Sequence, residues 1–225
     1  MKIYILNYIY LSKYKFKKGK DLKAYNNKLI RLYNQFYNYY KNKQYKITLT
    51  HFIDVCDFSV SEKQKMGANS NETVWYLNIK RLVKQFDNLF NQEEYNLIDI
   101  GSGFGNALIY FDKNYFFKSF TGIEFEKSFV IESQKQFKRL NIEHINIEYQ
   151  DCSKYQLSDK PHFIFMFNSL KSDSLKSFIK LNHQNMKKNK SVFAYVNFSH
   201  IDVFETFEAK INYINNNFRI ALISF

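Results

Sequence analysis

The stretch "NLIDIGSGFGNALIYF" at residues 96–111 joins a short apolar run, a cluster of glycines and a second apolar segment. Three of the chain's six glycines, Gly101, Gly103 and Gly105, fall within five positions directly behind the apolar run. A buried strand, a glycine-rich turn and a helix form the pattern with which an open α/β sheet holds a ligand against backbone N–H groups. The stretch therefore predicts a ligand-binding turn after the first strand of such a sheet.

From residue 96 onward, short apolar segments alternate with helix-length segments, which is typical of a parallel sheet covered on both faces. The expected strands span residues 96–100, 119–125, 146–151, 162–168 and 191–197, and the expected helices between them span 106–115, 126–141 and 172–186. The chain closes with two apolar segments around "NNN" at 215–217, which predicts an antiparallel hairpin. The predicted fold class is α/β, with a Rossmann-like, seven-stranded, mostly parallel sheet.

The part ahead of this sheet predicts helices. Residues 20–47 repeat apolar side chains every three or four positions, which indicates an amphipathic helix with these residues on its apolar face: Leu22, Tyr25, Leu29, Leu32, Tyr33, Phe36 and Tyr40. Tyr33, Tyr37, Tyr39 and Tyr40 fit a surface for a cation or a base, but such a stripe more often belongs to the core and its rim.

A second helix is expected over residues 73–90, with an N-cap at Asn71 or Thr73. We therefore predict an N-terminal helical extension over residues 1–70 and the sheet domain over 71–225.

The spacing of the glycines decides between ligand types. A dinucleotide fingerprint requires its third glycine at position 106, where this chain has Asn106. The sequence "LIDIGSGFG" instead resembles motif I of the class I S-adenosylmethionine-dependent methyltransferases, over about residues 70–225. This resemblance implies S-adenosylmethionine as cofactor and a cofactor contact by residues of the motif, namely Asp99, Gly101, Ser102, Gly103 and Gly105.

The resemblance extends to the ends of the next three expected strands. Glu124 ends the second strand, where the family's carboxylate binds both ribose hydroxyls as an acceptor-only group. Asp151 ends the third strand, at the position that accepts from the adenine amino group. Asn168 ends the fourth strand, where the family often places an active-site polar residue, so it is the candidate catalytic residue and would orient the acceptor through its carbonyl oxygen.

The acceptor stays open. Members that methylate amino groups of adenine or glutamine carry Asn-Pro-Pro-aromatic where this chain has "NSLK" at 168–171, which argues against those acceptors. The sequence is also similar to the non-SET protein-lysine methyltransferases and to a group of small bacterial methyltransferases. We therefore expect methyl transfer to a protein side chain, lysine among them, or to a small molecule.

Two alternatives come from different classes. A net charge of +12 fits an RNA methyltransferase or RNA-binding protein, although lysines along the whole chain also fit the bias of an AT-rich genome. Clustering of the lysines of 13–18 with Lys187 and Lys188 at the pocket mouth would favour RNA. A catalytically silent partner subunit is the other alternative, against which the intact glycines and carboxylates argue.

Cysteines and histidines add little. Cys56 and Cys152 lie far apart without a histidine at ligand spacing, which suggests neither a disulfide framework nor a zinc site and fits a reducing cytoplasm.

The apolar start of residues 1–20 is too short and polar for a membrane span. His200 follows the fifth expected strand and is a weak candidate for a general base. The oligomeric state is left open.

Overall fold

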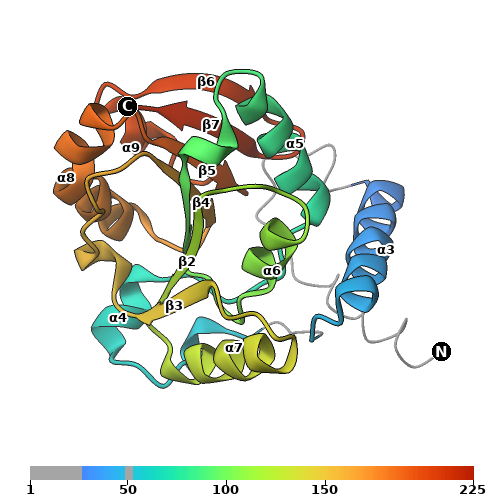
Figure 1. The fold of residues 1–225 in the computed structure, drawn as a ribbon. Coiled ribbons are helices and arrows are strands. Elements are labelled where there is room, and N and C mark those ends of the chain that lie inside the picture. The colour runs from blue at the N-terminus through green and yellow to red at the C-terminus, as the bar shows by residue number, and fades with distance from the viewer. Residues whose placement is uncertain (1–26, 49–52) are drawn as a thin grey trace.

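The computed structural model describes residues 27–48 and 53–225, which are arranged around one seven-stranded sheet (Figure 1). The strands are β1 (Asn96–Ile100), β2 (Ser119–Glu124), β3 (Ile145–Tyr149), β4 (His162–Phe167), β5 (Val192–Val196), β6 (Lys210–Asn215) and β7 (Ile220–Ser224). Their order is β3-β2-β1-β4-β5-β7-β6. The first five strands pair in parallel, and β7 lies antiparallel between β5 and β6. The predicted fold class is confirmed.

Helices lie on both faces of this sheet and around it (Figure 1). They are α3 (Lys28–Tyr45), α4 (Glu62–Gly67), α5 (Tyr76–Asp87), α6 (Asn106–Asp112), α7 (Lys127–Arg139), α8 (Ser172–Lys188) and α9 (Asp202–Glu205), with short 3-10 helices at Val55–Asp57, Gln92–Glu94 and Cys152–Lys154. Side chains of α5, α6 and α7 share one apolar core, and those of α8 and α9 share the other. Residues 150–161 between β3 and β4 form the short 3-10 turn and no crossover helix.

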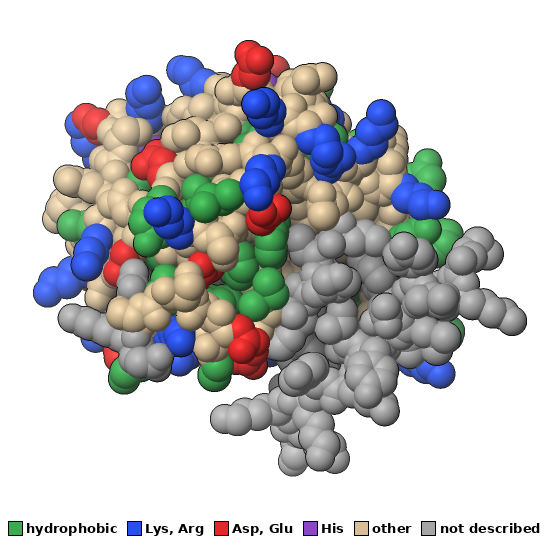
Figure 2. Space-filling model, turned by 90° about the horizontal axis from the view of Figure 1, so that it is seen from below, with side chains coloured by type: hydrophobic (Ala, Val, Ile, Leu, Met, Phe, Trp, Pro, Cys, Tyr) green, Lys and Arg blue, Asp and Glu red, His purple; other side chains and the backbone are tan. Residues whose placement is uncertain are grey.

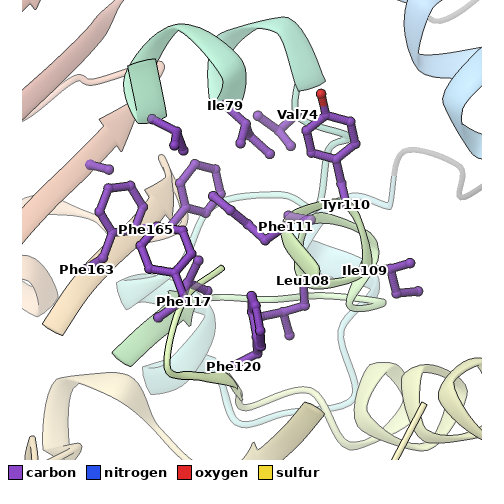
Figure 3. Packing of buried hydrophobic residues seen from close by; sticks show 14 of the residues in the cluster. Val74, Ile79, Leu108, Ile109, Tyr110, Phe111, Phe117, Phe120, Phe163 and Phe165 are labelled. Carbon is purple, nitrogen blue, oxygen red and sulfur yellow. The ribbon is translucent and has the colours of Figure 1, made fainter. Parts of the chain in front are cut away.

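The central strands β4 and β5 are nearly continuous apolar runs because both of their faces are buried. Leu97 of β1 joins the core under α5 and α6, whereas Ile98 and Ile100 join the core under α8. On the α5 side, the ring of Phe111 meets that of Phe165 edge-on at 5.1 Å between ring centroids. Figure 3 shows these rings beneath α5. The strict alternation of faces also places Asp99 on the side of Leu97, toward α5 and α6.

Helix α3 buries the face opposite to the predicted one. Three asparagines on its inner face, Asn34, Asn38 and Asn42, are buried, whereas its apolar stripe is exposed. The prediction that this stripe forms the core is therefore wrong, although Tyr37 and Tyr39 are half-buried. The part of the predicted helix before Asn27 lies outside the described residues.

Buried hydrogen bonds explain the reversal. Nδ2 of Asn38 donates to the carbonyl of Val74 at 2.7 Å, and the N–H of Tyr76 donates to Oδ1 of Asn38 at 2.9 Å. Tyr76 begins α5, so the predicted N-cap at Asn71 or Thr73 is wrong. A carboxamide from α3 satisfies this helix end instead, because the first N–H groups of a helix need an external acceptor.

Segment 53–73 lies over the carboxyl ends of the strands. Ile53 forms a β-bridge with Asn71, and Ala68 forms one with Leu170, which follows β4. The division into residues 1–70 and 71–225 stays a prediction. Among the described residues, no helix is both long and apolar enough to cross a membrane.

Candidate functional site

The glycine turn lies where the sheet changes direction. The chain runs outward from β1 through β2 to β3 and then returns to β4 on the other side of β1. In such sheets the crevice at this switch point, outside the carboxyl ends, is the usual ligand site. Gly101, Gly103 and Gly105 have φ angles of +71°, +53° and +73°. Residues other than glycine rarely adopt this left-handed region.

The protein's own side chains crowd these glycines. A Cβ atom on Gly103 would lie 2.8 Å from Oδ1 of Asn71. One on Gly101 would lie 2.7 Å from Oγ of Ser169, and one on Gly105 would lie 2.6 Å from the ring of Phe137. The close approach that the sequence predicted is thus made, in this structure, by Asn71 of segment 53–73, by Ser169 after β4 and by Phe137 of α7.

Glu124 ends β2, as predicted, and is buried. Its Oε2 accepts from the N–H of Gly103 at 2.8 Å, and its Oε1 accepts from the N–H groups of Phe125 and Glu126 at 2.9 and 2.8 Å. Burial raises the pKa of Glu124 to about 7, although the three amide donors oppose the rise. Since a carboxylate has about four lone-pair sites, the arrangement leaves one on Oε2 for a ligand.

Asp99 lies beside this carboxylate, one residue before the end of β1, and is 3% exposed. Burial, and then the charge of Glu124, raise its pKa to about 8. The neighbouring Ser102 is also buried, and among the described residues its Oγ is one of the few buried side-chain atoms without a hydrogen-bond partner. Two buried acids and a free hydroxyl therefore flank the glycine turn and suit a ligand with a cationic donor group.

Asp151 follows β3 and is half-buried. Its Oδ1 accepts from the N–H and the hydroxyl of Ser153, at 3.0 and 2.7 Å, so it caps the short 3-10 helix. Its Oδ2 lies 3.8 Å from Nζ of Lys154. The capping role that competes with ligand binding at this position is therefore present, and it leaves Oδ2 facing a cation.

Three adjoining cavities follow the strand ends in the order β1, β2, β3. The first is lined by Asp99, Gly101 and Ser102, the second by Gly101, Glu124 and Phe125, and the third by Phe125, Asp151 and Cys152. The first two share Asn71 and Phe167, and the second and third share Leu170. We call this chain of cavities the trough.

The trough is narrow at one end and wide at the other. The first two cavities measure about 40 Å³ each, room for a few water molecules, whereas the third measures about 660 Å³. Asn71 lines both narrow cavities and faces Gly103. A ligand of nucleoside size must therefore displace this side chain in order to lie along the glycine turn.

Asn168, which was predicted to end the fourth strand, comes directly after β4 and does not line the trough, whereas its neighbours Phe167 and Ser169 do. Its φ is +44°. Its Oδ1 accepts from Oγ of Ser199 at 2.6 Å and from Oη of Tyr195 at 3.4 Å, next to the end of β5. The carbonyl oxygen predicted to orient an acceptor is therefore already bonded within the protein.

Several lining residues were missed by the sequence analysis. Asn69 fastens segment 53–73 above the turn, because its Nδ2 donates to the carbonyls of Asn168 at 2.7 Å and Leu170 at 3.3 Å. Near β2, the carboxylate of Glu126 accepts from the N–H and hydroxyl of Ser59, both at 2.6 Å. The only available signal was position: Phe125 is the last residue of a predicted strand, and Ser169 and Leu170 are the first two residues after another.

Other candidates lie away from the trough. Lys187 and Lys188 end α8 and lie near the amino end of β5. This end of the strands is opposite to the carboxyl ends that form the trough. Figure 2 shows Lys and Arg scattered over one face of the described residues, with Asp and Glu between them. His200 lines none of the three cavities. No group of His, Cys, Asp and Glu in residues 27–48 and 53–225 is arranged to hold a metal ion.

The chain is similar to known proteins in its fold but not in its sequence. No family model matches the sequence, and no curated protein matches it. Among solved structures, the chain is similar to precorrin-6y C5,15-methyltransferase from Geobacter metallireducens, with 12% identity and a TM-score of 0.50, over 77% of this chain and 96% of that one.

Two further structures are similar at lower scores. A Streptococcus mutans protein described as a methyltransferase, in complex with SAH, has 13% identity and a TM-score of 0.48 over 65% of this chain and 97% of its own. The ribosomal protein L11 methylase from Lactobacillus delbrueckii has 11% identity and a TM-score of 0.47 over 66% and 78%. The chain has the class I, Rossmann-like methyltransferase fold, as its strand order and the precorrin enzyme indicate.

Proposed function

We propose that this chain is a methyltransferase that binds S-adenosylmethionine in the trough and transfers its methyl group to an acceptor outside β4. The observation that carries the proposal is the placement of Asp99, Glu124 and Asp151 at successive strand ends along one trough. A fold alone does not imply an activity, so the weight rests on these side chains.

The polar groups fit the cofactor. Asp99 and the free hydroxyl of Ser102 would hold the amino-acid end, where the ligand's ammonium group would favour the ionised form of Asp99. Glu124 would accept one ribose hydroxyl through Oε2, and the second hydroxyl would need one of the amide bonds to give way. Asp151 would accept from the adenine amino group in the wide cavity.

The bound cofactor supplies an activated methyl group on a sulfonium sulfur, so the protein's task is to position the acceptor and exclude water. Asn69 and Asn71 hold segment 53–73 across the trough and would cover the ligand. Asn168 remains the acceptor-side candidate because it lies between the ends of β4 and β5, next to trough residues. A protein side chain, lysine among them, or a small molecule is the proposed acceptor.

The RNA alternative has less support within the described residues. Lys187 and Lys188 lie at the opposite edge of the sheet from the trough, and Lys188 pairs with Asp159 at 2.5 Å. The lysines of 13–18 lie outside the described residues. The silent-subunit alternative would leave the buried acids Asp99 and Glu124 and the free hydroxyl of Ser102 without a ligand to bind.

Calorimetric titration with S-adenosylhomocysteine tests the cofactor step. We expect wild-type binding to be weakened in Glu124→Gln and retained in Glu148→Gln, whose side chain lines none of the three cavities. A tritiated-methyl screen over protein, RNA and small-molecule fractions then identifies the acceptor. Absence of binding by the wild-type protein would overturn the proposal.

A further inference from the structure

Helix α3 presents an apolar stripe to solvent. Five side chains on one face of the helix are exposed by 40–76%: Leu29, Leu32, Tyr33, Phe36 and Tyr40. Their spacing of three and four residues places them in one continuous band, opposite the buried asparagines. A band of this kind on a soluble domain marks an interaction surface.

The body of the protein holds α3 in this orientation. Asn38 binds the start of α5 on both sides of its carboxamide, and Oη of Tyr76 donates to Oδ1 of Asn42 at 2.7 Å. At the other end, Oη of Tyr45 donates to Oδ1 of Asn114 at 2.9 Å. Turning the stripe inward would break these buried bonds, so α3 is fixed with its apolar face outward.

The sequence of α3 carries charge of one sign. Residues 27–48 contain no Asp or Glu, but carry Lys28, Arg31, Lys41, Lys43 and Lys46. Residues 1–48 hold 12 of the 33 Lys and Arg and one of the 21 Asp and Glu, so this part of the sequence supplies +11 of the net charge of +12. Although lysines occur along the whole chain, nearly all acidic residues lie after this segment.

We propose that α3 docks the protein onto an anionic lipid surface, with its apolar stripe in the headgroup boundary and its lysines against lipid phosphates and carboxylates. An apolar face of leucine and phenylalanine with tyrosine beside it, on a purely cationic helix, has the composition of an interfacial helix. A second copy of the chain would bring two cationic helices together, so charge disfavours self-association. Leu29 and Leu32, which lie in the stripe beside the aromatic rings, offer nucleic-acid bases no flat stacking surface and favour lipid.

Co-sedimentation with vesicles tests this docking. The wild-type protein is expected to sediment with vesicles that contain phosphatidylserine and to stay in solution with pure phosphatidylcholine. Leu32→Glu and Phe36→Glu are each expected to weaken vesicle binding about tenfold or more. Each substitution removes an apolar side chain that the lipid boundary would bury and adds a negative charge. Leu181→Glu on α8 is the matched control, because Leu181 is 47% exposed, Leu32 is 40% exposed and the charge change is the same.

Three results would overturn the proposal. The first is wild-type protein that ignores anionic vesicles. The second is equal binding by all variants, which would mean that charge alone acts. The third is a wild-type dimer in sedimentation velocity that the α3 variants convert to monomers, which would make the stripe a contact between copies. Binding of S-adenosylhomocysteine, measured on the same proteins, fails or succeeds independently of all three.

Discussion

The backbone N–H of Gly103 donates a 2.8 Å hydrogen bond to Oε2 of Glu124, so the end of β2 fixes the turn that follows β1. Through Oε1 the same carboxylate binds the N–H of Glu126, the N-cap residue of α7. One buried acid therefore organises both the glycine turn and the start of the next helix. A ligand in the trough meets a turn that is already ordered.

Glu124→Gln should weaken the binding of S-adenosylhomocysteine by about tenfold or more. The substitution removes charge-assisted hydrogen bonds worth about 1.5–3 kcal/mol each and turns an amide NH₂ toward at least one N–H donor. Titration calorimetry measures the loss. Glu148→Gln on the neighbouring strand removes the same charge outside the trough and should bind normally; equal affinity of all three proteins would show that Glu124 serves only to fix the turn.

Asp99→Asn should stabilise the ligand-free protein at alkaline pH. The folded protein holds the Asp99 proton up to a pKa of about 8, whereas the ordinary value is 3.8, so the stability contributed by this group falls as pH rises from about 4 to 8. The variant cannot ionise and escapes this loss. Its melting temperature at pH 8.5 should exceed that of wild type by about 2–4 °C or more, which corresponds to about 1 kcal/mol.

The gain should shrink toward pH 5, where Asp99 is protonated in the folded protein. The Asp99→Asn variant should also bind S-adenosylmethionine more weakly than wild type, because it lacks the carboxyl group that ionises beside the ligand's ammonium. Thermal unfolding at both pH values with and without ligand separates the two effects. A pH-independent difference between the proteins would contradict the burial of an ionisable Asp99.

The central strands of the sheet could be predicted because both of their faces are buried and their residues are therefore mostly apolar, as in β5, where all five residues are buried. The inner face of α3 could not be predicted from periodicity. Apolar spacing assigns the wide aromatic stripe to the core, but Asn38 is buried because it caps α5, a helix nearly forty residues further along the chain. Such long-range polar bonds leave no local pattern in sequence.

The same division holds in the trough. Asp99, Glu124 and Asp151 could be placed in advance because parallel strands bring their carboxyl ends to one edge. Asn71 could not, because it reaches Gly103 only through the bridge between Ile53 and Asn71. The internal bonds of Asn168 were also hidden, since Tyr195 and Ser199 come from the next strand and the loop after it.

Gly103→Val should weaken cofactor binding strongly. Its φ of +53° is unfavourable for a β-branched residue, and the added Cβ would meet Oδ1 of Asn71 at 2.8 Å. Calorimetry should show a loss of about tenfold or more, because one strained residue costs about 1–3 kcal/mol. The double variant Gly103→Val/Asn71→Ala removes only the steric conflict with Asn71 and keeps the unfavourable φ at position 103. Normal binding by the single variant Gly103→Val would place the ligand elsewhere.

Asn71→Ala should speed ligand association several-fold. The side chain lines both narrow cavities, of about 40 Å³ each, and must leave before a nucleoside-sized ligand can enter. The chain's single tryptophan, Trp75, follows the trough residue Val74 and provides a fluorescence signal for stopped-flow mixing. An unchanged association rate would mean that the ligand enters without moving segment 53–73.

Asn168→Ala should keep cofactor affinity within about twofold and lose methyl transfer, the pattern of a group whose interaction is made in the transition state. The nucleoside half of the cofactor is assigned to Glu124 and Asp151, and Asn168 lines no part of the trough. Ser199→Ala is the control, because it removes the 2.6 Å bond to Oδ1 and leaves the carboxamide in place. Affinity is measured by calorimetry and transfer by tritiated methyl on the acceptor that the screen identifies. If Ser199→Ala loses methyl transfer as completely as Asn168→Ala, the orientation of the carboxamide is what matters. If Asn168→Ala instead loses cofactor binding, Asn168 belongs to the cofactor side and the acceptor must lie elsewhere.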